Sequence, residues 1–177
     1  MRRHACLGLW PGTGPRCCEP KQKPIGLASP ALPFSQHELG LLKAGNADAR
    51  GVARLVRFLH SQGVPWIIEN PWSSNIWYSP AFEGLRRLEG TSLVAVDQCS
   101  CGTAWRKRTG FLCGHLSPVA LESLERLSCS GRRVCQYSGQ PHLELVGNRM
   151  TARAQEFPAP LSRALARALV TSCTSCA

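Results

Sequence analysis

The stretch from position 64 to position 72, Val-Pro-Trp-Ile-Ile-Glu-Asn-Pro-Trp, limits how this chain can fold more than any other. Its apolar run is short, β-branched and apolar on both faces, so it predicts a buried strand of a parallel sheet. Ligands of open α/β sheets bind beyond the carboxyl ends of the strands, which is where Glu69 and Asn70 would project. The stretch therefore predicts a ligand-binding site at the end of this strand. The alternative is that Glu69 caps the next helix and Asn70-Pro71 only forms a turn.

Helix signals flank this strand on both sides. Apolar residues spaced by three and four within 52–59 predict an amphipathic helix, and Gly63 stands where a C-cap glycine belongs. Ser79-Pro80 predicts the start of a second helix and Ser117-Pro118 the start of a third, because each pairs an N-cap side chain with a first-turn proline. Leucines and alanines within 161–169 predict a closing helix that covers the sheet.

A second apolar run at 93–96 predicts another buried strand, which ends at Asp97. Two such strands joined by a helix predict a right-handed parallel crossover, so we expect Glu69 and Asp97 along one edge of one sheet. The alternative for Asp97 is a loop cap. A third strand is predicted at 110–113, and its start is strongly basic because the triplet 106–108 precedes it.

The charge of the chain favours a polyanionic partner. The net charge is +10, from 21 basic against 11 acidic residues, so nucleic acid is the first expectation. Arg106, Lys107 and Arg108 follow Trp105, and this combination suits nucleic acid because cations bind phosphates while an indole stacks on a base. The alternative is a solvated charge run at a turn, since the arginines of the chain are scattered.

Several motifs, in order, resemble the cytosine-5 DNA methyltransferases. Glu69-Asn70-Pro71 after a buried strand is similar to their Glu-Asn-Val motif, whose glutamate contacts the ring nitrogen of a flipped-out cytosine. Further along, Trp105 to Thr109 stands where that family carries its Gln-x-Arg-x-Arg hairpin. The match is closest to a divergent methyltransferase-like family and spans roughly Leu39 to Val170. Its other elements here are Ser73-Ser74, Trp77, Asp97-Gln98-Cys99, Gly102 and Lys107-Arg108-Thr109.

This resemblance implies an α/β fold with part of a Rossmann-like sheet, of the S-adenosylmethionine methyltransferase type, and flanking helices. It implies that Glu69 and Asn70 are the catalytic residues that engage the base, in a pocket with the aromatic side chains of Trp72 and Trp77. Contacts to the substrate and its phosphates are implied for a further set: Trp72, Asp97, Arg106, Lys107 and Arg108.

The cofactor of that family, S-adenosylmethionine, is not expected to bind this chain alone. Only 63 residues precede Val64, and about half of them form the helix before it, whereas a single βαβ unit takes roughly 30 residues. The chain is therefore expected to be the C-terminal half of a methyltransferase domain, inactive by itself and completed by a missing half or a partner chain. The alternative is a non-catalytic basic module that binds nucleic acid or another protein.

Composition divides the chain into three parts. Residues 1–35 are rich in proline, glycine and cysteine and predict an irregular or disordered segment; 36–170 form the α/β half-domain, and 171–177 a flexible tail. No signal-peptide core follows Met1 and no apolar segment has the length of a membrane span. We therefore expect an intracellular protein, in the nucleus or the cytoplasm, that is not secreted.

The ten cysteines are expected to be reduced thiols, most of them small buried hydrophobes. Several cysteines and histidines have the side chains of structural zinc ligands, but their spacing is unlike that of a compact zinc knuckle. These are Cys99, Cys101, Cys113, His115, Cys129, Cys135 and His142. We therefore predict no metal site, and we name Cys129, Cys135 and His142 as the best candidate ligands should one exist.

Overall fold

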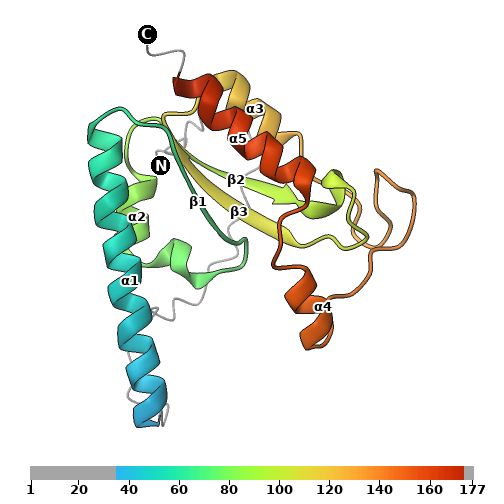
Figure 1. Cartoon of the computed structure of the whole chain (residues 1–177), viewed down its shortest axis with the longest axis horizontal. Coiled ribbons are helices and arrows are strands. Elements are labelled where there is room, and N and C mark those ends of the chain that lie inside the picture. The colour runs from blue at the N-terminus through green and yellow to red at the C-terminus, as the bar shows by residue number, and fades with distance from the viewer. Residues whose placement is uncertain (1–34, 174–177) are drawn as a thin grey trace, which may run out of the picture.

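A three-stranded sheet with flanking helices forms the fold in the computed structural model, which describes residues 35–173 (Figure 1). The mixed α/β class is confirmed. The strands are β1 (Trp66–Pro71), β2 (Thr91–Asp97) and β3 (Arg108–Gly114). The helices are α1 (Gln36–Ser61), α2 (Pro80–Arg86), α3 (Pro118–Glu125), α4 (Asn148–Arg153) and α5 (Ala159–Cys173), with short 3-10 turns η1 (Asn75–Tyr78) and η2 (Gln98–Cys101). The irregular segment predicted for 1–35 and most of the predicted tail lie outside the described residues.

Strand β3 lies between β1 and β2 and pairs antiparallel with both. The predicted parallel crossover is therefore wrong: β1 and β2 run in the same direction, but they are not neighbours. The physical reason is burial, because β3 is buried from Thr109 to Gly114 whereas β1 is a half-buried edge strand. The strand that is best covered on both faces takes the centre of the sheet.

Glycines in β3 let two indole rings pack directly on its backbone. A Cβ atom at Gly114 would lie 2.3 Å from the Trp66 ring, and one at Gly110 would lie 3.0 Å from the Trp77 ring. Both tryptophans are buried, at 4% and 2% exposure respectively. Larger residues at these two positions would push the rings off the sheet, so the glycines make the close packing possible.

The helices begin at side-chain caps. Ser35 and Glu38 form a capping box at the start of α1, which therefore begins well before the predicted amphipathic segment. Ser79 accepts a hydrogen bond from a backbone N–H of α2, and Ser117 does the same for α3, each followed by proline as the sequence predicts. Gly63 follows α1 with a φ of 66°, in the left-handed region that glycine adopts at low cost.

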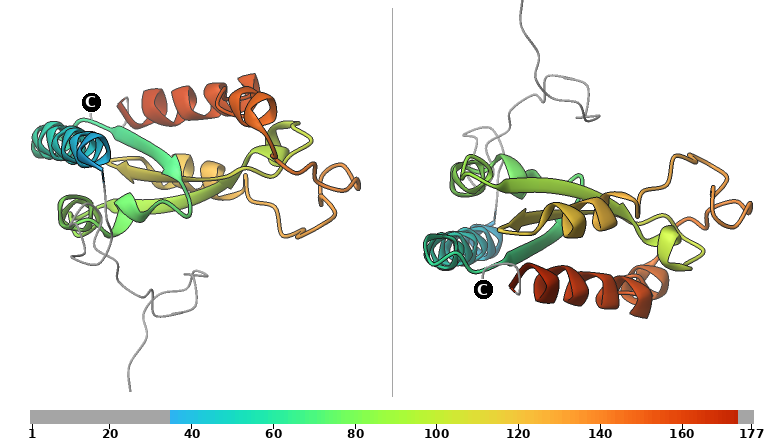
Figure 2. Two further views of the ribbon diagram at one scale, coloured as in Figure 1. Left: turned by 90° about the horizontal axis from the view of Figure 1, so that it is seen from below. Right: turned by 90° about the horizontal axis from the view of Figure 1, so that it is seen from above.

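Each face of the sheet carries its own hydrophobic cluster, because successive residues of a strand point to opposite faces. Phe111 packs with residues of α3 and α5, including Leu124 and Leu161, and Leu112 packs with residues of α1 and α2 on the other face. The predicted closing helix is confirmed, since α5 covers one face (Figure 2). Within residues 35–173, no helix is both long enough and apolar enough to cross a membrane.

The chain between α3 and α4 has no helix and only one isolated bridge, between Val134 and Pro141. It extends beyond the end of the sheet, where it is drawn in orange (Figure 2). We call residues 128–147 the extended loop. Its large apolar side chains are mostly exposed, as are Leu143 at 54% and Val146 at 71%. The loop therefore has little hydrophobic core to hold it in place.

Candidate functional site

Glu69 and Asn70 lie within β1 rather than beyond it. Glu69 pairs with Phe111 of β3 and Asn70 with Gly110, so their side chains point to opposite faces of the sheet. Both are half-buried, and neither side chain forms a hydrogen bond with the described part of the chain. Burial raises the pKa of Glu69, and the nearby Lys107 opposes this rise. The two side chains therefore do not share a face of the sheet, and their joint role on one base stays a prediction.

Asp97 lies at the same end of the sheet as Glu69, but β3 separates the two. Its side chain is fully buried. Its carboxylate accepts hydrogen bonds from Arg106 Nε, at 3.1 Å, and from the backbone N–H of Cys129, at 2.8 Å. Asp97 is thus occupied by partners inside the protein, and the loop-cap alternative describes its contacts better than a substrate-facing role.

The three basic residues before β3 have different surroundings. Arg106 is mostly buried against Asp97, and its guanidinium also donates to the Cys129 carbonyl at 2.7 Å. Lys107 donates from Nζ to the Ala154 carbonyl at 2.8 Å. Arg108 is more exposed; its guanidinium lies 3.9 Å from the Asp97 carboxylate and 5.4 Å from the centre of the Trp72 ring. Arg108 is therefore the member of the triplet that is best placed to meet a phosphate.

The tryptophans do not form the predicted aromatic pocket. Trp77 is buried in the core, and its indole N–H donates to the Pro71 carbonyl at 3.0 Å. Trp105 is 8% exposed and donates to the Gln98 side chain at 2.9 Å, so its indole is not free to stack on a base. Among the tryptophans of residues 35–173, only Trp72 is half-exposed, and the Arg108 guanidinium lies over its ring.

A basic hollow opens beside the triplet, between β3 and the extended loop. Its volume is about 730 Å³ and it holds five cationic side chains against one acidic one. A second hollow of about 440 Å³ shares Arg106, Arg108 and Arg132 with it. Arg132 and Arg133 are exposed and form no ion pair with the described residues. The basic hollow is lined by Arg106, Lys107, Arg108, Arg132, Arg133, Pro141, His142, Leu143, Glu144 and Leu145.

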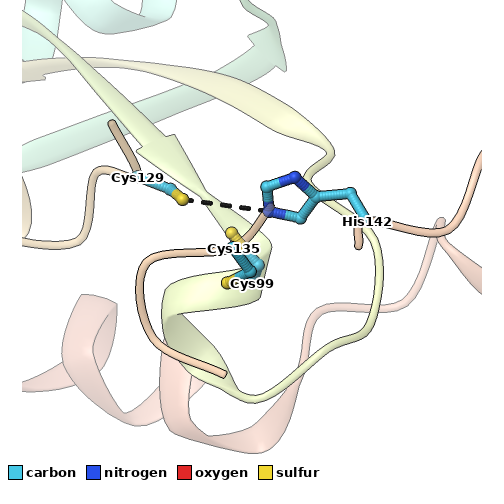
Figure 3. Close-up of side chains that lie close together, drawn as sticks. All are labelled: Cys99, Cys129, Cys135 and His142. Carbon is cyan, nitrogen blue, oxygen red and sulfur yellow. Dashed lines mark hydrogen bonds between the residues drawn. The ribbon is translucent and has the colours of Figure 1, made fainter. Parts of the chain in front are cut away.

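Three thiols and one imidazole meet next to the basic hollow. Cys99, Cys129, Cys135 and His142 place one possible ligand atom each within 4.8 Å of all the others, and we call this group the Cys3His cluster. In Figure 3 the side chains converge from separate segments of chain. The Cys129 sulfur lies 3.8 Å from His142 Nε2. The three thiols are free and almost fully buried.

Short backbone contacts set these four positions. Cys99 lies in η2, directly after β2, and Cys129 is fixed by its N–H bond to Asp97. Cys135 and His142 face each other across a hairpin, in which the Cys135 N–H donates to Gln140 at 2.8 Å and the His142 N–H donates to Arg133 at 2.9 Å. Residues from η2 and from two parts of the extended loop are thus brought to one point.

The thiols of the cluster differ in acidity. A hydrogen bond from the backbone N–H of Ser138 lowers the pKa of the Cys135 thiol to about 6, with smaller contributions from Tyr137 and His142, whereas burial raises the pKa of Cys99. His142 Nδ1 is buried and has no hydrogen-bond partner among the described residues. Chemically, the arrangement offers the sulfur and nitrogen donors that bind divalent transition metals.

Sequence reasoning found part of this site. It listed Cys99 among the possible ligands but named only Cys129, Cys135 and His142 as the best, and it did not bring Arg132 and Arg133 to the basic triplet. The other candidates lie elsewhere. Cys113 is in the core, where burial raises its thiol pKa to about 12, and Cys101 packs in the same hydrophobic cluster. His115 stacks on His60, with ring centres 4.2 Å apart. No spacing rule links Cys99 to a hairpin that begins more than 30 residues later; only the fold does.

Comparison with known protein families, with curated proteins and with solved structures finds no match to this chain.

Proposed function

We propose that this chain is a non-catalytic module that binds nucleic acid through the basic hollow. The observation that carries the proposal is the gathering of five cations around one concave surface, with Glu144 as the only acidic residue of its lining. Arg132 and Arg133 come from the extended loop and Arg108 from β3, so the fold concentrates charges that are scattered in the sequence. A concave cationic surface attracts the phosphate backbone and releases its counterions on binding.

The three exposed arginines supply the contacts in this proposal. Arg106 and Lys107 bind internal acceptors and set the shape of the hollow. Arg108, Arg132 and Arg133 are exposed, and only Arg108 among them has an internal acidic neighbour, Asp97 at 3.9 Å. Guanidinium pairs with phosphate oxygens through two parallel hydrogen bonds. Such contacts position a nucleic acid without reading its sequence, so we propose weak binding with little sequence preference.

Fluorescence anisotropy with labelled duplex DNA, measured over a range of salt concentrations, tests the proposal. Affinity should fall steeply as salt rises, and R132A/R133A should weaken binding and reduce the salt slope by about 2, one for each lost phosphate contact. The matched control is R163A/R167A, which removes the same charge from exposed positions on α5. Equal losses in the two variants would contradict the proposal, as would an affinity that does not change with salt.

A second candidate function is that of a methyltransferase half-domain, related to the cytosine-5 DNA methyltransferases and completed by another chain. Two observations favour it. Glu69 is half-buried within an edge strand and its carboxylate accepts no hydrogen bond from the described residues, and the outer edge of β1 pairs with no strand of the described residues. An open edge accepts further strands, which is where the rest of a Rossmann-like sheet would add. The antiparallel β3 between β1 and β2 departs from the parallel sheet that the resemblance implies.

Calorimetry with S-adenosylmethionine tests the half-domain candidate. The half-domain is expected not to bind the cofactor at micromolar concentration by itself. A micromolar dissociation constant for this chain alone would refute the half-domain and would point to a complete methyltransferase site.

A further inference from the structure

We propose that Cys99, Cys129, Cys135 and His142 form a structural zinc site that fastens the extended loop to the end of the sheet. The distances fit the metal. Bond lengths of about 2.3 Å for Zn–S and about 2.05 Å for Zn–N give tetrahedral edges of about 3.8 Å between sulfurs and about 3.6 Å from sulfur to nitrogen. The Cys129 sulfur lies 3.8 Å from His142 Nε2, and all four atoms lie within 4.8 Å of one another.

The chemistry of the four ligands favours zinc over other metals and indicates a structural site. Three thiolates and one imidazole are soft and borderline donors, which suit Zn²⁺ and do not suit Mg²⁺ or Ca²⁺. Four protein ligands complete a tetrahedron and leave no position for water or substrate, which is the mark of a structural site. The three sulfurs are shielded from solvent, with residue exposures of 3%, 2% and 3%.

The extended loop requires an interaction besides hydrophobic burial to hold it in an ordered conformation. Among the described residues of the extended loop, only Cys129 and Cys135 belong to a buried hydrophobic cluster, which they form with Cys99. Three thiol side chains bury too little apolar area to order a loop of this length, and the loop has no helix or ladder of strands to help. A metal that links η2 to the start of the extended loop and to its 135–142 hairpin supplies free energy that hydrophobic burial does not.

The site also explains the position of Arg132 and Arg133. Both lie between the ligands Cys129 and Cys135, and they line the basic hollow. Zinc coordination would hold these two guanidinium groups beside Arg108. The metal site stands on the ligand geometry alone, so a failure of nucleic-acid binding would leave it intact.

The test measures metal on the full chain, purified with reductant from cells supplied with zinc. Elemental analysis should find one zinc per chain. Replacement by Co²⁺ should give the visible bands of a tetrahedral ion and the near-ultraviolet charge-transfer bands of cobalt–thiolate bonds. C113S is the matched control, because it removes a buried thiol that lies outside the cluster, and it should keep the metal. C129S should lose it.

The variant C129S could lose the metal because it fails to fold, so His142→Cys is measured as a second variant. It replaces one ligand by another, so it should retain one metal per chain and shift the cobalt spectrum from that of three sulfurs and one nitrogen towards that of four sulfurs. Wild-type chain that takes up neither zinc nor cobalt would overturn the proposal. So would a disulfide among the three thiols in the reduced preparation, or retention of the metal by C129S at the level of C113S.

Discussion

Arg106 joins the end of β2 to the chain that follows α3, because one guanidinium donates to the carboxylate of Asp97 and to the carbonyl of Cys129. The Nε–Oδ1 distance to Asp97 is 3.1 Å, and Asp97 is fully buried. Asp97 in turn accepts from the Cys129 N–H at 2.8 Å. This pair therefore holds one thiol of the Cys3His cluster in place and is expected to stabilise the fold.

Replacing Asp97 by Asn should lower the free energy of unfolding by about 3 to 5 kcal/mol. Asn has the same shape, but it leaves the mostly buried Arg106 guanidinium without a counter-charge. Urea denaturation measures the loss. Asp48→Asn on the exposed face of α1 is the control, and it should change stability by less than about 0.5 kcal/mol. Equal effects of the two substitutions would show that the Asp97 pair is not a stabilising link.

Local sequence signals predicted the elements of this fold well. Ser79-Pro80 and Ser117-Pro118 begin helices because the cap and the first-turn proline act within one turn of chain, and Gly63 ends α1 for a similarly local reason. The apolar runs that became β1 and β2 were also found, since a strand needs only a few β-branched residues in a row.

Strand order and the composition of the site depend on contacts that no local signal contains. The run that became β3 was predicted as a strand, but its place between β1 and β2 follows from burial on both faces. Trp66 and Trp77 cover one face, and residues of α3 and α5 cover the other. Cys99 joins the Cys3His cluster for the same reason. The predicted role of Glu69 and Asn70 assumed that both side chains project beyond a strand, whereas the pairing of both with β3 turns them to opposite faces.

Leu112→Ala should cost about 2 to 5 kcal/mol of stability, because Leu112 is fully buried in the central strand. Ile67→Ala should cost less, because Ile67 is only partly buried in the edge strand β1. Both substitutions remove a branched aliphatic side chain of similar volume, so each is a control for the other. Chemical denaturation gives the two values. A larger cost at Ile67 would mean that β1, and not β3, is the centre of the sheet.

Glu69→Gln should leave stability within about 0.5 kcal/mol of wild type at pH 7, with any change in the stabilising direction. Burial raises the pKa of Glu69 above its ordinary value of 4.5, so the folded state disfavours the carboxylate. The contribution of Glu69 to stability is thus full below pH 4.5 and is lost as pH rises through the raised pKa. Denaturation of wild type and variant at pH 4 and pH 7 checks this. A loss of several kcal/mol at pH 7 would reveal a buried charge partner instead of an open site.

The His60 and His115 pair should make the protein less stable in mild acid. Burial lowers the pKa of His60 from 6.5, the adjacent His115 lowers it further, and Glu89 opposes them. His60 Nδ1 also lies 3.4 Å from the Trp66 indole N–H, a contact that suits the neutral ring. The unfolded chain therefore takes up the proton at higher pH than the folded one, and stability falls as pH drops below 6.5 through the lowered pKa.

Urea denaturation at pH 7.5, 6.5 and 5.5 measures this loss in wild type, in His60→Gln and in His37→Gln. The amide introduced by His60→Gln does not titrate and can still accept from the Trp66 indole, so this variant should flatten the fall in stability between pH 6.5 and 5.5. His37 lies exposed on the same helix, and its replacement should leave the fall unchanged. If instead His60→Gln kept the full pH dependence, the proton would be taken up by another group, and the stacked pair would not be the origin of the acid sensitivity.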